Sequence, residues 1–173
     1  DYSVTDVFAP ASYTMQPGVT PPVLDTPLSR FPNFTLLAAG VSAVGLGVGR
    51  HALDELNDLA QGKKPQYSSR TLAQNSFTQI ELARAEAQLR SARAFLLDEL
   101  GAAWTTISEG SAVTIEQRTA IRLAATHAAT VGATVADAAF TLAGGTAVYD
   151  TSVLGRCLRD AHVVTQHIQT APK

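Results

Sequence analysis

Cysteine, aromatic residues and clustered positive charge are scarce in this sequence. Its 173 residues include one cysteine, Cys157, so no disulfide can form within the chain. Aromatic residues make up 6% and charged residues 16%, and the formal net charge is −2. The sequence has no lysine- or arginine-rich run of the kind that marks binding to nucleic acid or an anionic membrane surface. We therefore expect neither partner, and the lone cysteine and lack of a leader-like start favour a reducing, cytoplasmic location.

The one candidate for a membrane span runs from Phe34 to Gly49 and reads FTLLAAGVSAVGLGVG. It is shorter than the roughly 20 apolar residues that cross a bilayer, and charged residues follow it from Arg50 onwards. A buried core helix is the better interpretation. Its GLGVG segment lacks the preceding strand that a dinucleotide-binding turn requires, so close helix packing through small residues is favoured over phosphate binding.

Sites for metals and for common hydrolytic chemistry are missing as well. The four histidines have no metal-ligand spacing, and no cluster of cysteines or carboxylates accompanies them. The sequence has neither a Gly-x-Ser-x-Gly motif nor a P-loop lysine. It therefore predicts no metal site and gives no support to a hydrolase or a nucleoside triphosphatase.

Proline divides the chain into two parts. Six of its eight prolines lie between Pro10 and Pro32, where they disfavour helix. Residues 2–8 alternate polar and apolar side chains and predict one short strand. Residues 1–32 are thus expected to form an extended arm rather than a packed element.

Four helices are predicted after the arm. The first spans residues 33–62 and ends at Gly62, the second runs from about Leu72 to Ile107, and the third runs from Thr114, with Gln117 completing a capping box, to Gly144. The fourth begins near Ser152. Each has an apolar stripe and short connections, so the predicted fold is all-α, an antiparallel four-helix bundle with an extended N-terminal arm. The third helix is rich in alanine and threonine, which suggests a central or interface position.

The fourth helix carries two patterns. Its apolar stripe is expected to include Leu154, Ala161 and Ile168. The charged residues Arg156, Arg159 and Asp160 fit either a solvated face or an ion pair that fixes this helix to another element. The sequence alone leaves both open.

Four segments resemble the acyl-CoA dehydrogenase superfamily, and especially its flavin-dependent monooxygenase branch. They read DVFAP, LAAGVSAVGLGVGRHALDEL, FTQIELARAEAQLRSARAFL and GGTAVYDTSVLGRCLRDAHVVTQH. The resemblance implies that residues 1–32 are the end of a β domain and a linker, and that residues 33–173 are the C-terminal helical domain. It also implies FAD or FMN as cofactor, a homo-oligomer that is a tetramer in most relatives, a separate flavin reductase and a small-molecule substrate.

The resemblance assigns five residues to a site. Gly144 and Gly145 match a glycine pair whose backbone lies near the phosphate or adenosine part of the flavin in a neighbouring subunit. Arg70 and Gln79 fall near positions that contact the same cofactor. His167 falls where monooxygenase members place a histidine near the flavin ring and the substrate pocket, which implies a catalytic role.

Two departures from the family's dehydrogenases bear on the activity. Their catalytic glutamate would stand at Ile168, or in some members near Asn33, and neither side chain can accept a proton. The resemblance thus favours a two-component monooxygenase acting on an aromatic or polycyclic substrate. The alternatives are a true acyl-CoA dehydrogenase and a non-catalytic bundle that serves only in oligomerisation.

Overall fold

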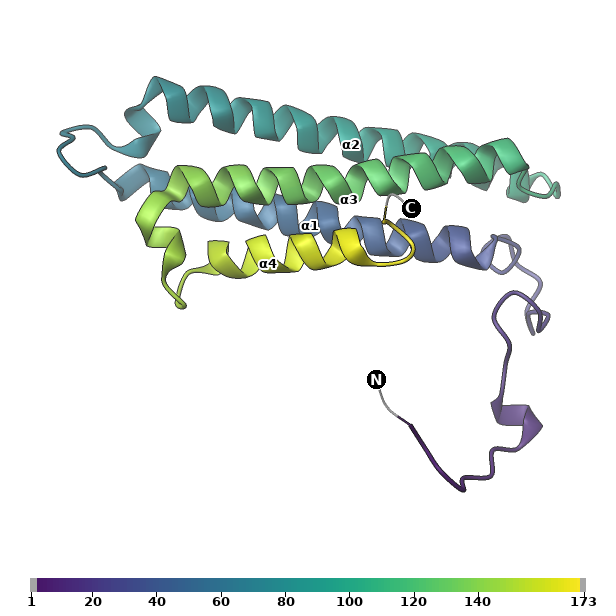
Figure 1. Cartoon of the computed structure of the whole chain (residues 1–173). Helices are drawn as coiled ribbons and strands as arrows, with labels where there is room; N and C mark the ends of the chain where they lie inside the picture. The colour runs from purple at the N-terminus through teal and green to yellow at the C-terminus, as the bar shows by residue number, and fades with distance from the viewer. Residues whose placement is uncertain (1–2, 172–173) are drawn as a thin grey trace.

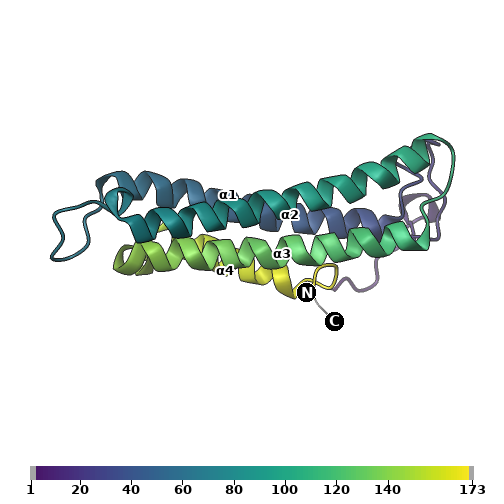
Figure 2. The same ribbon diagram turned by 90° about the horizontal axis from the view of Figure 1, so that it is seen from above.

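The computed structural model describes residues 3–171, and every regular element in that range is helical (Figure 1). The four long helices are α1 (Asn33–Gly62), α2 (Ser76–Ser108), α3 (Ile115–Ala143) and α4 (Val153–Gln166). Three short 3-10 helices accompany them, η1 (Ala11–Tyr13), η2 (Leu72–Gln74) and η3 (Gly144–Val148). The all-α bundle is confirmed, and each long helix runs antiparallel to the one before it (Figures 1 and 2).

The bundle is built around one central pair of helices. α1 and α3 run in the same direction and pack along most of their length, with α2 and α4 each lying against this pair. Over residues 3–171, α2 and α4 make no contact with each other. The alanine-rich third helix therefore has the central position that its sequence suggested.

Small residues allow α1 and α3 to approach closely. A Cβ added to Gly45 would lie 3.3 Å from the Cα of Ala129, and one added to Gly49 would lie 3.3 Å from the Cα of Gly132. Gly47, on the outer face of α1, has open space around it. Close helix packing is thus confirmed for two glycines of the GLGVG segment.

The core lies on both sides of the central pair. On one side, apolar residues of α1 and α3 pack with Ala85, Leu89, Ala92 and Leu96 of α2. On the other side they pack with Leu154, Cys157 and Ala161 of α4. A third, smaller cluster at the end of the bundle holds Phe31 between α2 and α3.

The N-terminal arm is exposed from Ser3 to Arg30, apart from half-buried Ser29. The strand expected at residues 2–8 is wrong over the described residues 3–8. Asp6 has a positive φ of 58°, and the described part of the chain offers no second strand with which to pair. Residue 2 lies outside the described range.

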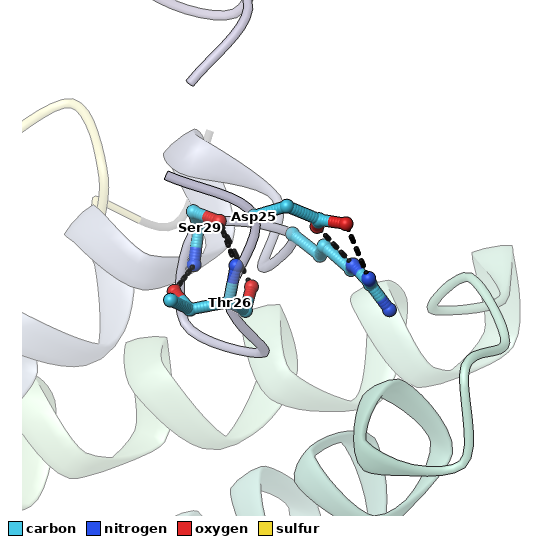
Figure 3. A network of polar contacts seen from close by, with 4 residues as sticks. Asp25, Thr26 and Ser29 are labelled. Carbon is cyan, nitrogen blue, oxygen red and sulfur yellow. Dashed lines mark hydrogen bonds and ion pairs between the residues drawn. The ribbon is translucent and has the colours of Figure 1, made fainter. Parts of the chain in front are cut away.

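The arm ends in a closed turn that leads into α1 (Figure 3). Arg30 donates to both carboxylate oxygens of Asp25 at 2.6 Å, and the Thr26 and Ser29 hydroxyls accept each other's backbone N–H groups. The pKa of the Asp25 carboxyl is lowered by this hydrogen-bonded guanidinium. The turn delivers Phe31 into the core directly before α1 begins.

Two helix boundaries differ from prediction. α2 begins at Ser76 rather than near Leu72, because Thr71 and Gln74 form a capping box around η2 and Asn75 then caps α2 by accepting from the backbone N–H of Phe77 at 2.9 Å. α4 ends at Gln166, and Ile168 is 79% exposed instead of completing the buried stripe. The predicted bounds of α1 and the Thr114–Gln117 capping box of α3 are confirmed.

By length and composition alone, two stretches could cross a membrane, α1 and the continuous helical stretch Ile115–Val148. In each, 44% of the most apolar 18-residue window is buried inside the bundle. The core helices of soluble proteins pass the same test, so this finding is weak evidence for a span. Buried residues of α1 and α3 belong to the core that these two helices form with α2 on one side and α4 on the other.

Candidate functional site

The first part of the candidate site is the turn at the end of α3. Gly144 has φ 57° and ψ −149°, a conformation that residues with a Cβ rarely adopt. It ends α3, and its backbone N–H donates to the carbonyl of Thr141. Gly144 and Gly145 are both exposed, so their backbone is open to a ligand.

Lys63, from the segment after α1, holds this turn in place. Its ammonium donates to the carbonyl of Ala143 and to the hydroxyl of Thr146. It lies 4.0 Å from the point where a Cβ of Gly144 would stand. Burial lowers the pKa of the Lys63 ammonium. A cation beside an exposed glycine turn is a combination that suits a phosphate or another anion.

Arg70 lies in the loop that joins α1 to α2. The loop is ordered by its own hydrogen bonds, because the Ser68 hydroxyl donates to the Arg70 carbonyl and accepts from the Arg70 N–H, both at 3.1 Å. The Arg70 side chain is exposed. The loop joins the glycine turn through Lys63, whose carbonyl accepts from the N–H of Leu72 at 2.8 Å.

Gln79 stands in the first turns of α2. Its side-chain amide donates to the carbonyl of Ala73 at 2.8 Å, which ties α2 to η2. It also lines a shallow groove between α1 and α2, together with Arg50 and Glu86, which form an ion pair. Arg70, Gln79, Gly144 and Gly145 thus come to one end of the bundle, where α1 and α3 finish and α2 and α4 begin (Figure 1).

His167 lies away from that end. It directly follows α4, whose 14 residues place it about 21 Å along the bundle from the start of that helix. Its side chain is exposed. The structure therefore does not bring His167 together with the other four predicted residues, and the two parts of the site are distinct.

Local hydrogen bonds fix the position of His167. The His167 carbonyl accepts from the N–H groups of Thr170 and Ala171 at 2.9 and 2.8 Å. The buried Thr170 hydroxyl donates to the carbonyl of Val164 at 2.6 Å. A tight turn therefore follows α4 and holds the histidine backbone.

The imidazole ring is also held. Its Nδ1 accepts the backbone N–H of Gln169 at 3.2 Å. Because Nδ1 accepts, the proton of the neutral ring belongs on Nε2. His167 thus presents an Nε2–H donor on an exposed ring, which can donate a hydrogen bond to a ligand or exchange a proton with it.

Arg122 of α3 connects this turn to the central helix pair. Its Nη2 donates to the carbonyls of Ile168 and Ala171 at 3.0 and 3.3 Å. Neither Arg122 nor Lys63 was identified from the sequence. Lys63 follows the helix-ending Gly62 directly, which is a usable signal for a side chain that caps carbonyls, whereas no local pattern marks Arg122.

In the part of the chain that the structure describes, the charged residues of α4 form a solvated helix face and not an ion pair to another element. Arg156, Arg159 and Asp160 are all exposed, and none of them forms an ion pair with another residue in the range 3–171. A solvated helix face is therefore what the structure shows. A polar contact between α3 and α4 is instead made by His162 and Asp137, with Nε2 2.9 Å from Oδ1.

The described residues contain no group of three or more histidine, cysteine, aspartate or glutamate side chains that could hold a metal ion.

Comparison with known proteins gives consistent relatives. The chain is 41% identical over 167 residues to an indole-3-acetate monooxygenase of Pseudomonas putida and 35% identical to one of Acinetobacter baumannii. Each alignment covers 96% of this chain but only 43% of the relative, so the chain spans less than half the length of these proteins.

Solved structures share the fold. XiaF from Streptomyces sp., solved with FADH2 and glycerol, aligns with a TM-score of 0.80 at 20% identity and covers 84% of this chain and 37% of its own. The HsaA monooxygenase from M. tuberculosis aligns with a TM-score of 0.74 at 22% identity, over 85% of this chain and 37% of its own. Residues 39–172 match the family described as acyl-CoA dehydrogenase, C-terminal domain. With that match over most of its length and the same helical fold, the chain belongs to the acyl-CoA dehydrogenase C-terminal domain family.

Proposed function

We propose that this chain is the C-terminal domain of a flavin-dependent monooxygenase that inserts one oxygen atom into an aromatic or polycyclic substrate. Residues 33–173 would be the bundle domain, and residues 1–32 the end of a β domain with its linker. The names of the relatives at 41% and 35% identity support this activity. Their greater length supports a larger protein around the chain.

The observation that carries the proposal is the ring of His167. It is exposed, its Nδ1 is held by the N–H of Gln169, and its Nε2–H is available to a ligand. The two positions at which the resemblance would place a dehydrogenase base hold Asn33 and Ile168. A hydrogen-bond donor and proton carrier without a carboxylate base suits oxygen transfer better than removal of a proton from a thioester.

The geometry of His167 supports a role as hydrogen-bond donor and proton carrier. The Nε2–H donates to an oxygen atom of the bound reactants and gives or takes a proton there. Arg122 and Thr170 keep the following turn fixed, so the ring does not have to be ordered when the substrate binds. A reduced flavin, when bound, supplies the two electrons that oxygen insertion requires.

The residues at the opposite end fit the phosphate part of a flavin. Gly144 and Gly145 offer an exposed backbone, and Lys63 places a positive charge beside it. Arg70 adds an exposed guanidinium in the neighbouring loop, and the Gln79 amide lies at the start of α2. FAD is the flavin to test first, with FMN as the alternative, because the XiaF structure contains FADH2.

We also propose a homo-tetramer, a separate flavin reductase as electron donor, and a cytoplasmic location. Large apolar side chains stay exposed along α2, where a second subunit would cover them: Phe77, Ile80, Leu97 and Trp104. Sedimentation of the full-length protein tests this assembly, and a stable monomer would contradict it.

The activity is tested with the full-length protein loaded with flavin. Chemically reduced enzyme, mixed with oxygen and indole-3-acetate, should give a product heavier by one oxygen atom in mass spectrometry. In the same preparation, a panel of acyl-CoA thioesters added without oxygen should leave the oxidised flavin's absorbance unchanged. Bleaching of the flavin by a thioester, with no oxygenated product, would replace the monooxygenase by a dehydrogenase.

A further inference from the structure

A small hollow lies beside the turn that holds His167. It is lined by Phe34, Thr35 and Ala38 of α1, Arg118 and Arg122 of α3, and Gln169. Gln169 is also the residue whose N–H binds the ring of His167. The hollow and the His167 ring are therefore neighbours, joined through one residue.

The charge of the hollow is positive. Two of its six lining residues are arginines one helical turn apart, and none of the six is acidic. Arg122 uses Nη2 for the carbonyls of Ile168 and Ala171. A guanidinium has five N–H donors, so Arg122 keeps capacity for an anion, and Arg118 has an exposed side chain. Two guanidinium groups on one wall form a good receptor for a carboxylate, which accepts paired hydrogen bonds.

The lining of the hollow is also partly apolar. Phe34, which is 58% exposed, and the buried Ala38 both line the hollow from α1, so apolar side chains contribute to it beside the arginines of α3. The hollow measures about 120 Å³, less than the roughly 300 Å³ of a small ligand pocket. It can therefore take one polar end of a small substrate, while the remainder lies outside it.

We propose that this hollow binds the carboxylate of an aromatic acid substrate and so places its ring near His167. This inference rests on the proposed function and extends it by naming the substrate class. A flavin phosphate is also an anion, but the glycine turn that Lys63 holds lies about 33 Å from Arg122 along α3, and it offers the phosphate a separate place. The relatives at 41% and 35% identity are both named for indole-3-acetate, which is an aromatic acid with one carboxylate. Those names agree with a hollow that binds a carboxylate.

The test compares binding of indole-3-acetate and of its neutral amide, indole-3-acetamide, to the flavin-loaded full-length protein by titration calorimetry. The wild-type protein should prefer the acid. Arg118→Gln should weaken binding of the acid roughly tenfold, as expected for the loss of a hydrogen bond to a charged group, and change binding of the amide less than about twofold. Arg122→Gln should do the same. Arg90→Gln, an exposed arginine on α2, is the matched control and should leave the preference unchanged.

Arg122→Gln could weaken binding indirectly, because Arg122 also supports the turn after His167. Among the described contacts, the Arg118 side chain has no such structural role, so Arg118→Gln tests the carboxylate site directly. The inference is overturned if the wild-type protein does not bind the acid, if it binds acid and amide equally, or if both variants keep the wild-type preference. It is also overturned if the variants weaken flavin binding instead, because the anion would then be the cofactor's phosphate.

Turnover separates this inference from the proposed function. If the acid binds with dependence on the arginines but is not oxygenated by reduced flavin and oxygen, the carboxylate site stands and the monooxygenase proposal fails. If the acid is oxygenated and its affinity is independent of both arginines, the activity stands and the site fails.

Discussion

Gly132 of α3 lies directly against the backbone of Gly45 in α1. A Cβ at position 132 would stand 2.4 Å from the Gly45 carbonyl oxygen and 2.7 Å from its carbon. Backbone atoms of two long helices cannot move aside as a flexible side chain can. The distance between α1 and α3 is therefore set at this crossing by the absence of a side chain.

Gly132→Ala should lower the free energy of unfolding by about 1–3 kcal/mol, the range for overpacking a close contact. Gly47→Ala is the matched control, because Gly47 also lies in a helix and a Cβ at this position would meet no atom within 4 Å. That control should be neutral or stabilising by about 0.5–1 kcal/mol. Urea unfolding followed by circular dichroism measures both, and equal stabilities for the two variants would contradict the packing described for the central pair.

Gly144→Ala should also be destabilising, here through backbone strain. Its φ of 57° and ψ of −149° cost a residue with a Cβ about 1–3 kcal/mol. Gly145→Ala is the control, since a Cβ there meets nothing within 4 Å and its φ is not positive. Thermal unfolding should show a lower Tm for the variant at 144 alone. A similar Tm for both variants would show that the turn does not need this conformation.

Cys157 should react slowly with thiol reagents in the folded protein. Only 4% of it is exposed, and burial raises the pKa of its thiol, so the reactive thiolate is scarce at neutral pH. The folded protein also keeps this proton at pH values where the unfolded chain has lost it. The stability contributed by the group is therefore present below about pH 9 and falls as the pH rises through the raised pKa.

The measurement is labelling by a chromogenic disulfide reagent at pH 7.5, with and without urea. Labelling should be complete in urea and much slower without it. Fast labelling of the folded protein would place Cys157 outside the α1, α3 and α4 core.

His167→Ala should lower the rate of oxygenation roughly a hundredfold in the full-length enzyme, the usual scale for losing a positioned acid, base or donor. The fold should be unaffected, because the side chain is exposed and its one described hydrogen bond is to the N–H of Gln169. His167→Gln, which restores a donor without the imidazole, should recover part of the rate. An unchanged rate in His167→Ala, at wild-type flavin content, would remove His167 from the mechanism.

Local signals in the sequence predicted much of the fold. Gly62 followed by Lys63-Lys64-Pro65 marked the end of α1, and Thr114 with Gln117 marked the start of α3, because caps and stops act on their immediate neighbours. The boundaries that were wrong depended on competing local bonds. Thr71 and Gln74 capped a short 3-10 turn, and Asn75 took the cap of α2.

Tertiary contacts explain what the sequence could not predict. Ile168 fits the spacing of the buried stripe, yet the hydrogen bonds of Thr170 and Arg122 end α4 before it. Arg122 acts on residues 46 and 49 positions later, so no short pattern indicates its role. Lys63 likewise reaches residues 80 and 83 positions away. The roles of Arg70, Gln79, Gly144, Gly145 and His167 stay predictions.

The packing of α1 against α3 also determines how the two parts of the candidate site, around Gln79 and around His167, can influence each other. Within residues 3–171, α2 and α4 each contact both α1 and α3, but they do not contact each other. Any signal between α2 and α4 in this range therefore has to pass through α1 or α3, which meet each other backbone to backbone at Gly45 and Gly132. The Gly45–Gly132 junction has no side-chain rotamers to switch, so a displacement of α1 at this point moves α3 as a whole, and the reverse. Events at the Gln79 face and at the His167 turn should be energetically independent unless α1 or α3 shifts, and a shift of one should carry the other with it.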